Sequence, residues 1–168
     1  NIKREWVVAS LVLIILVDLW SVGRDYLNEK HFKPKRGYKS QFLADDFDKP
    51  NGLCFSPDES LLYVADSGKP GHIRRLELTD GKHVKSSTVF TVVRPGIPDG
   101  LRVDKNGNIF TSAWDGIQVY NSSGNLIGKI LVPEDRTSNC CFGGKLKNIL
   151  FITADKSMYS IMLNAYGV

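Results

Sequence analysis

The feature that most constrains this chain of 168 residues is a segment that recurs three times after residue 42. The copies read PNGLCFSPDESLLYVADSG from Pro50, PDGLRVDKNGNIFTSAWDG from Pro98 and TSNCCFGGKLKNILFITADKS from Thr137. Each copy places a polar residue in a predicted turn, followed by an apolar strand, a polar turn and a second strand. Short β-rich stretches that alternate with turn signals indicate an all-β structure.

Further strands follow each copy, so the repeat predicts a four-stranded unit. The third strands are HIRRLEL, IQVYN and MYSIML, and the first two copies add VKSSTVF and LIGKILV as a fourth. The opening polar residues Asn51, Asp99 and Asn139 are spaced by about 48 and about 40 residues, which is typical of propeller blades. One blade cannot cover both of its own faces, so blades pack against one another around an axis. The sequence therefore predicts about three blades, the last one incomplete.

Three motifs resemble the SMP-30/gluconolactonase/LRE family in their order and spacing. They are KPNGLCFSPDESLLYVADS from Lys49, IPDGLRVDKNGNIFTSAWDG from Ile97 and TSNCCFGGKLKNILFITA from Thr137, and LADDFDKPNG from Leu43 is typical of the connection into the first. The resemblance covers residues 42–168 and implies the carboxyl-terminal half of a six-bladed β-propeller. Members of this family are divalent-metal-dependent sugar lactonases. The resemblance thus implies hydrolysis of an aldonolactone, such as gluconolactone, to the hydroxy acid.

The resemblance also implies a single divalent cation at the mouth of the central channel. It carries over Asn51 as a carbonyl-type ligand and Asp99 as a carboxylate ligand, and Asp99 also matches the residue proposed as general base. Such oxygen ligands suit hard cations such as Ca²⁺ and Mg²⁺, with Mn²⁺ and Zn²⁺ as alternatives. A bound cation polarises a lactone carbonyl, and a nearby carboxylate can take the proton of the attacking water. Asn139 holds the equivalent place in the third copy and is expected to line the channel, with a direct role as the alternative.

The sequence departs from the family pattern before residue 42. The resemblance implies a third metal ligand, a glutamate near the start of the propeller, and a substrate-binding arginine and asparagine on an early blade. Glu5, Glu29 and Arg36 lie in no matching motif. Two oxygen ligands should hold a metal poorly, so the alternative interpretation is a non-catalytic, membrane-tethered propeller fragment or binding module. The expected partners are a sugar lactone and either the missing blades or a second copy through self-association. The net charge of +4 gives no reason to expect nucleic acid.

Residues 1–41 differ in character from the repeats. The apolar stretch WVVASLVLIILVDLWSV, from Trp6 to Val22, predicts a membrane-spanning helix at the lower edge of the required length, with a buried soluble helix as the alternative. DLWSVGRDYLNEKHF, residues 18–32, resembles the end of the last transmembrane helix in the YfhO family of bacterial multi-spanning membrane proteins. A chain that begins with Asn1 indicates a fragment or a processed product, and the junction after residue 41 is a natural fusion or an assembly artefact. The expected location is a membrane if residues 6–22 span it, and otherwise the cytoplasm or periplasm of a bacterium.

The remaining reactive side chains suggest no competing site. The three cysteines Cys54, Cys140 and Cys141 form no disulfide framework and are expected to be small buried hydrophobes. Asp66 and Asp155 follow second strands, where turn hydrogen bonds are expected rather than catalysis. The absence of a G-x-S-x-G motif argues against a serine triad.

Overall fold

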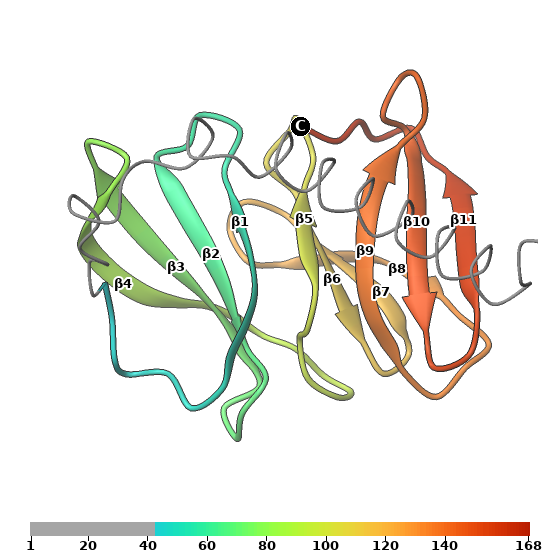
Figure 1. Ribbon diagram of the computed structural model, residues 1–168, viewed down its shortest axis with the longest axis horizontal. Helices are drawn as coiled ribbons and strands as arrows, with labels where there is room; N and C mark the ends of the chain where they lie inside the picture. Colours follow the sequence, from blue (N-terminus) through green and yellow to red (C-terminus); the bar gives the residue numbers. More distant parts are fainter. Residues whose placement is uncertain (1–42) are drawn as a thin grey trace, which may run out of the picture. The chain divides into compact units, whose positions relative to one another are not determined.

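The computed structural model describes residues 43–168, in which strands alternate with turns and loops and no helix occurs. The strands make three antiparallel sheets that follow one another along the chain (Figure 1). The first sheet has the order β1-β2-β3-β4, the second β5-β6-β7-β8 and the third β9-β10-β11. The bounds are β1 Pro50–Phe55, β2 Leu61–Asp66, β3 His72–Thr79, β4 His83–Val92, β5 Leu101–Val103, β6 Ile109–Ala113, β7 Gly116–Tyr120, β8 Leu126–Leu131, β9 Thr137–Gly143, β10 Ile149–Ala154 and β11 Met158–Met162.

The strand pattern agrees closely with the sequence. The second strands β2 and β10 coincide with the predicted LLYVAD and ILFITA, and β6 begins one residue later than predicted. Strand β4 is longer than the predicted VKSSTVF, because it pairs with β3 along the full length of that strand. The all-β class is confirmed, and three consecutive sheets are consistent with part of a propeller. The total number of blades stays a prediction.

Polar turns fix the ends of the strands. Between β5 and β6 the buried carboxylate of Asp104 accepts hydrogen bonds from the backbone N–H groups of Asn106 and Asn108, at 2.9 and 2.8 Å. Gly107 in the same turn has a φ of 80°, a left-handed conformation that costs glycine little. The KNGN sequence therefore closes the hairpin by the turn chemistry that its composition predicts.

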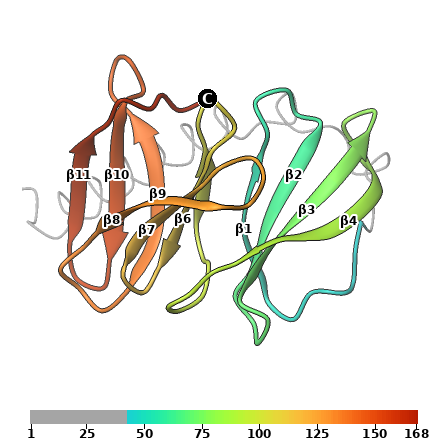
Figure 2. The ribbon, with the colours of Figure 1, turned by 180° about the vertical axis from the view of Figure 1, so that it is seen from behind.

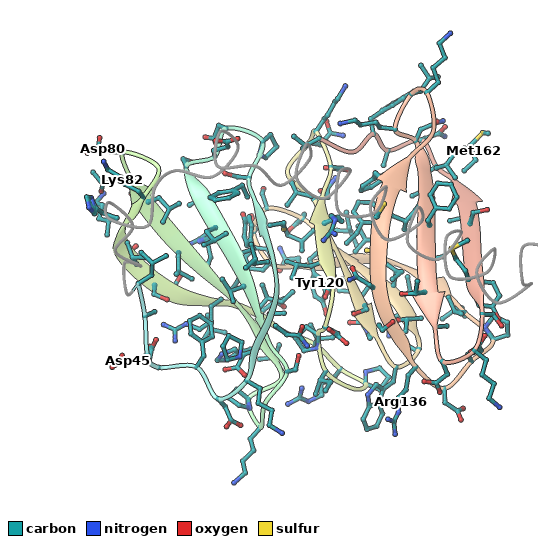
Figure 3. All side chains as sticks on the ribbon, in the orientation of Figure 1. Asp45, Asp80, Lys82, Tyr120, Arg136 and Met162 are labelled. Carbon is teal, nitrogen blue, oxygen red and sulfur yellow. The ribbon has the colours of Figure 1, made fainter. Side chains whose placement is uncertain are left out.

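The three sheets pack face to face through two apolar clusters. Between the first and second sheets the buried residues are Tyr63, Ala65, Ile73, Val93, Leu101, Val103, Ile109, Ala113 and Tyr120. Between the second and third sheets they are Phe110, Ile117, Val119, Val132, Cys140, Leu150 and Ile152. The middle sheet lies between the other two (Figure 2), and Figure 3 labels Tyr120 in this central region. Strands β6 and β7 are buried along their whole length because neighbours cover both of their faces.

A smaller cluster lies on the far face of the first sheet. It consists of Leu62, Val64 and Leu76, with Phe47, Leu78 and Val84 packed against it. The guanidinium of Arg74 lies 4.9 Å from the centre of the Phe47 ring and forms an ion pair with Asp46 at 2.6 Å. These contacts fasten the loop before β1 onto part of this face.

Two predictions concern residues that the structure does not describe. The membrane helix from Trp6 to Val22 and the YfhO-like segment of residues 18–32 both lie outside residues 43–168. Within the described part of the chain, no helix is long and apolar enough to cross a membrane. The domain boundary after residue 41 also stays a prediction.

Substitution of Leu150 by alanine should destabilise the described unit strongly. The Leu150 side chain is fully buried between the second and third sheets, so truncation leaves a cavity and should lower the free energy of unfolding by about 2–5 kcal/mol. Leu131→Ala is the matched control, because Leu131 is 73% exposed. Urea denaturation followed by tryptophan fluorescence measures both variants. Equal midpoints for the two variants would contradict this packing.

Candidate functional site

The candidate site lies where the innermost strands of the three sheets meet. Strand β1 contacts β5, and β5 contacts β9 (Figure 1). The backbone N–H of Gly52 donates to the carbonyl oxygen of Asp99 at 3.0 Å, and that of Gly100 donates to the carbonyl oxygen of Ser138 at 2.8 Å. The same contact therefore recurs between successive inner strands. It aligns Asn51, Asp99 and Asn139 along one end of the three strands.

Two glycines permit this close approach. A Cβ atom at Gly52 would overlap the carbonyl oxygen of Asp99, and one at Gly100 would overlap the side chain of Asn139. Asn51, Asp99 and Asn139 were predicted to lie in turns, but Asn51 lies within β1 and Asn139 within β9. The turn prediction is wrong at these two positions. Each glycine is required because the backbone of the next sheet passes directly against it.

Asn51 is held between two neighbours. Its Nδ2 donates to Ser67 Oγ at 3.1 Å, and Ser67 Oγ donates in turn to the carbonyl oxygen of Pro98 at 2.6 Å. The same amide donates towards the Asp99 carboxylate and lowers its pKa. The Oδ1 oxygen of the Asn51 amide acts only as an acceptor, so it is the atom that could contact a cation.

The backbone of Asp99 is fixed from the other side. Its N–H donates to Ser112 Oγ at 3.2 Å, and Ser112 Oγ donates to the carbonyl oxygen of Ser138 at 3.2 Å. Ser112 is completely buried in β6. Sequence reasoning missed Ser67 and Ser112 as positioning residues. Serines in a strand give no signal of their partners, because these contacts join residues far apart in the chain.

Asp99 and Asp66 show how hydrogen bonding decides the pKa of a half-buried or buried carboxylate. Burial raises the pKa of Asp99 above its ordinary value, and the Asn51 amide opposes this only in part. Burial also acts to raise the pKa of Asp66, but three backbone N–H donors outweigh it and lower the pKa. Those donors are Asp48, Lys49 and Gly68, at 2.9, 2.8 and 3.0 Å. The predicted turn role of Asp66 is confirmed.

The raised pKa of Asp99 has a consequence for stability. The folded protein binds the Asp99 proton more tightly than the unfolded chain does, so ionising this group disfavours folding. Its contribution to the free energy of unfolding therefore falls as the pH rises between the unfolded and folded pKa values. Among the four ion pairs of residues 43–168, none involves Asp99. A half-buried carboxylate without a cationic neighbour is electrostatically suited to a bound cation.

The ligand atoms of the candidate site are of the type that a hard cation prefers, but there are too few of them to fill its coordination shell. Asn51 and Asp99 supply oxygen atoms, which Ca²⁺ and Mg²⁺ prefer, whereas Ca²⁺ takes about six to eight of them. Within the described residues, no group of three or more His, Cys, Asp or Glu side chains could hold a metal. Asn139 is exposed, and its Oδ1 accepts a hydrogen bond from the N–H of Cys140 at 2.9 Å. Asn51 and Asp99 thus supply two oxygen ligands, and the other ligands of a Ca²⁺ ion would have to come from other groups or from water.

The cysteines differ from one another. Cys140 is buried between the second and third sheets, as predicted, and burial raises the pKa of its thiol to about 12. Cys54 is half-buried, and burial likewise raises its pKa to about 12. Cys141 is exposed, so the prediction of a buried residue is wrong there. Consecutive residues of a strand point to opposite faces, and no neighbouring sheet covers the Cys141 side of β9.

Comparisons with known proteins agree on one family. The sequence profile of the SMP-30/gluconolactonase/LRE-like region matches residues 28–156. The gluconolactonase of Zymomonas mobilis is 36% identical over 129 residues, which cover 71% of this chain and 36% of that protein. The matched region begins at residue 28, within residues 1–41, which differ in character from the repeats.

Solved structures give the same result. A gluconolactonase from Xanthomonas campestris is 39% identical with a TM-score of 0.67, covering 77% of this chain and 42% of that one. A calcium-binding regucalcin from Agrobacterium tumefaciens shares the fold, with a TM-score of 0.70 at 24% identity, covering 77% of this chain and 51% of that one. The chain spans about half, or less, of the length of the relatives it matches.

Replacing Asn51 by alanine should raise the pKa of Asp99 further in the metal-free protein. The change removes the amide that lowers this pKa and leaves the effect of burial unopposed. NMR titration of the Asp99 side-chain carboxyl carbon gives the value directly. The same substitution at the exposed Asn164, beyond the far end of β11, is the control. An unchanged Asp99 titration in the Asn51 variant would show that the two side chains do not interact.

Proposed function

The chain belongs to the SMP-30/gluconolactonase/LRE-like family, and on that premise we propose that it is part of a sugar lactonase. Its substrate would be an aldonolactone such as gluconolactone, which is opened by water to the hydroxy acid. The observation that carries the proposal is that Asn51, in β1, lies beside Asp99, just ahead of β5, where the backbone N–H of Gly52 donates to the Asp99 carbonyl oxygen. We further infer that residues 43–168 are three blades of a six-bladed propeller whose channel opens at this pair.

Asp99 would act as the general base in this proposal. Its raised pKa makes the carboxylate a better proton acceptor than that of an ordinary aspartate. The carboxylate takes a proton from the attacking water as the new C–O bond forms at the lactone carbonyl. The proton then passes to the ring oxygen as the ester bond breaks. Water is consumed, and one hydroxy acid is formed.

Asn51 and Asp99 would also hold the divalent cation. Ca²⁺, Mg²⁺, Mn²⁺ or Zn²⁺ would supply Lewis-acid polarisation of the lactone carbonyl when bound. Asn51 would contribute its Oδ1 carbonyl oxygen, while its Nδ2 donates to Ser67 Oγ. The anchoring of Asp99 by Ser112 and of Asn51 by Ser67 limits how far either oxygen can move.

A non-catalytic binding module is the second candidate. The observation that favours it is that the described residues supply two oxygen donors and three sheets, fewer than a full cation shell or a closed ring needs. In this alternative, residues 1–41 would be a separate segment that tethers the propeller part to a membrane. Neither candidate calls for a nucleic-acid partner.

Asp99→Asn should abolish divalent-cation binding by the full chain and lower lactone hydrolysis about 100-fold or more, because it removes both a charged ligand and the base. Calorimetric titration with CaCl₂ measures binding, and pH-stat hydrolysis of gluconolactone, with and without EDTA, measures turnover. Cation binding without turnover would favour the binding module.

Asp80→Asn is the matched control for this experiment. Asp80 is exposed in the turn between β3 and β4 (Figure 3), at the end of the first sheet opposite Asn51. The control removes the same charge without touching the site, so it should bind cations as the unaltered chain does. Equal cation affinity in the Asp99 and Asp80 variants would rule out Asp99 as a ligand.

A further inference from the structure

An exposed tryptophan lies near the candidate site, in the turn between β6 and β7. The Trp114 side chain is 49% exposed, although tryptophan is a residue that folding buries to a high degree on average. It follows by two positions the buried Ser112, whose Oγ accepts a hydrogen bond from the backbone N–H of Asp99. Because β6 pairs with β5, this turn begins about one strand spacing, roughly 5 Å, from the inner strand that follows Asp99.

Two contacts hold Trp114 against the loop that leads to Asp99. Its backbone N–H donates to the carbonyl oxygen of Pro95 at 3.4 Å, and a Cβ atom at Gly96 would overlap the indole ring. Gly96 has a φ of 87°, a conformation that residues with a side chain rarely adopt. Asp99 follows Gly96 by three positions, which span at most about 11 Å. The indole ring and Asp99 therefore lie close enough for one monosaccharide-sized ligand to contact both.

A positive charge lies over the same ring. The guanidinium carbon of Arg136 is 6.0 Å from the centre of the Trp114 ring, and Figure 3 labels Arg136 at the lower edge of the picture, just before β9. The next residue, Thr137, is buried, and its hydroxyl lies 2.7 and 2.8 Å from the carbonyl oxygens of Ala113 and Gly116. The start of β9 is thereby fastened to the turn that carries Trp114.

The guanidinium of Arg136 is exposed and forms none of the four ion pairs of residues 43–168. The carboxylate in the adjoining turn, that of Asp115, accepts hydrogen bonds from Lys129 at 2.6 Å and from Gln118 at 2.9 Å, so it is already paired. A guanidinium carries five N–H donors in one plane, which suit hydroxyl and carbonyl oxygens. Arg136 therefore places an exposed group of donors beside an exposed aromatic ring.

We propose that Trp114 and Arg136 form a sugar-ring subsite of the candidate site. The C–H groups of the lactone ring pack on the indole, and Arg136 donates hydrogen bonds to the ring hydroxyl groups. Sites for small molecules combine aromatic walls with a few placed polar groups, which is the composition found here. The assignment rests on the proposed function for the identity of the ligand. It adds two specificity-determining residues to Asn51 and Asp99, which act on the lactone carbonyl and the attacking water.

Steady-state hydrolysis by the full 168-residue chain tests the two roles separately. Gluconolactone and δ-valerolactone share a six-membered ring, but only gluconolactone carries hydroxyl groups. Trp114→Leu should raise KM about 10-fold for both lactones with little change in kcat, because it removes the surface on which the ring packs. Arg136→Gln should raise KM about 10-fold for gluconolactone alone. Trp114→Phe keeps an aromatic ring and should restore most of the affinity that the leucine variant loses.

Calorimetric titration with glucono-δ-lactam measures binding without turnover. The lactam keeps the ring and hydroxyl groups of gluconolactone, and its amide resists hydrolysis. Its Kd should rise about 10-fold in Trp114→Leu and in Arg136→Gln. Lys82→Gln and Tyr166→Leu are the matched controls, because Lys82 is exposed between β3 and β4 (Figure 3) and Tyr166, 45% exposed, lies beside the turn between β5 and β6. Circular dichroism checks that every variant is folded.

A Trp114 or Arg136 variant that binds the lactam as tightly as its control would overturn the role given to that residue. An equal rise in KM for both lactones in Arg136→Gln would overturn the assignment of Arg136 to the hydroxyl groups. No lactam binding by the unaltered chain would overturn the subsite, and hydrolysis of gluconolactone by that chain would leave the proposed function standing without it. Lactam binding that depends on both residues, in a chain that hydrolyses neither lactone, would support the subsite and contradict the proposed lactonase activity.

Discussion

The described structure depends on the face-to-face packing of neighbouring sheets. The middle sheet is packed on both of its faces, and its strands β6 and β7 have no exposed residue. Burial of apolar area on two faces stabilises each sheet more than one face alone could, which is why a single repeat does not suffice for a fold. The same stacking brings the inner strands β1, β5 and β9 next to one another. The candidate site is therefore a product of core packing.

Within that stack, small residues set the geometry of the site. Gly52 and Gly100 let the inner strands approach so closely that backbone hydrogen bonds connect successive sheets. The buried Ser112 then fixes the Asp99 backbone against the third sheet. The pKa of Asp99 is raised because burial is opposed by only one amide.

The two aspartates Asp66 and Asp99 illustrate why a residue type does not define a role. Both follow strand or turn signals in the repeats, and Asp66 is buried while Asp99 is half-buried. Asp66 receives three backbone N–H groups and is thereby a structural residue with a lowered pKa. Asp99 has no such backbone donors to its carboxylate, and its pKa is raised. The difference arises from the neighbouring backbone.

The sequence by itself determined the strands, their grouping into repeats and the family, because alternation and turn residues act locally and leave a pattern in the chain. It also singled out Asn51 and Asp99 through their motifs. Only the tertiary structure decided that Cys140 is buried while Cys141 is exposed, and that Ser67 and Ser112 hold the site. Adjacent residues of a strand face opposite sides, and which side is covered depends on the next sheet. The sheet that covers a face is built from residues tens of positions away, so the local sequence pattern cannot predict which side of a strand is buried.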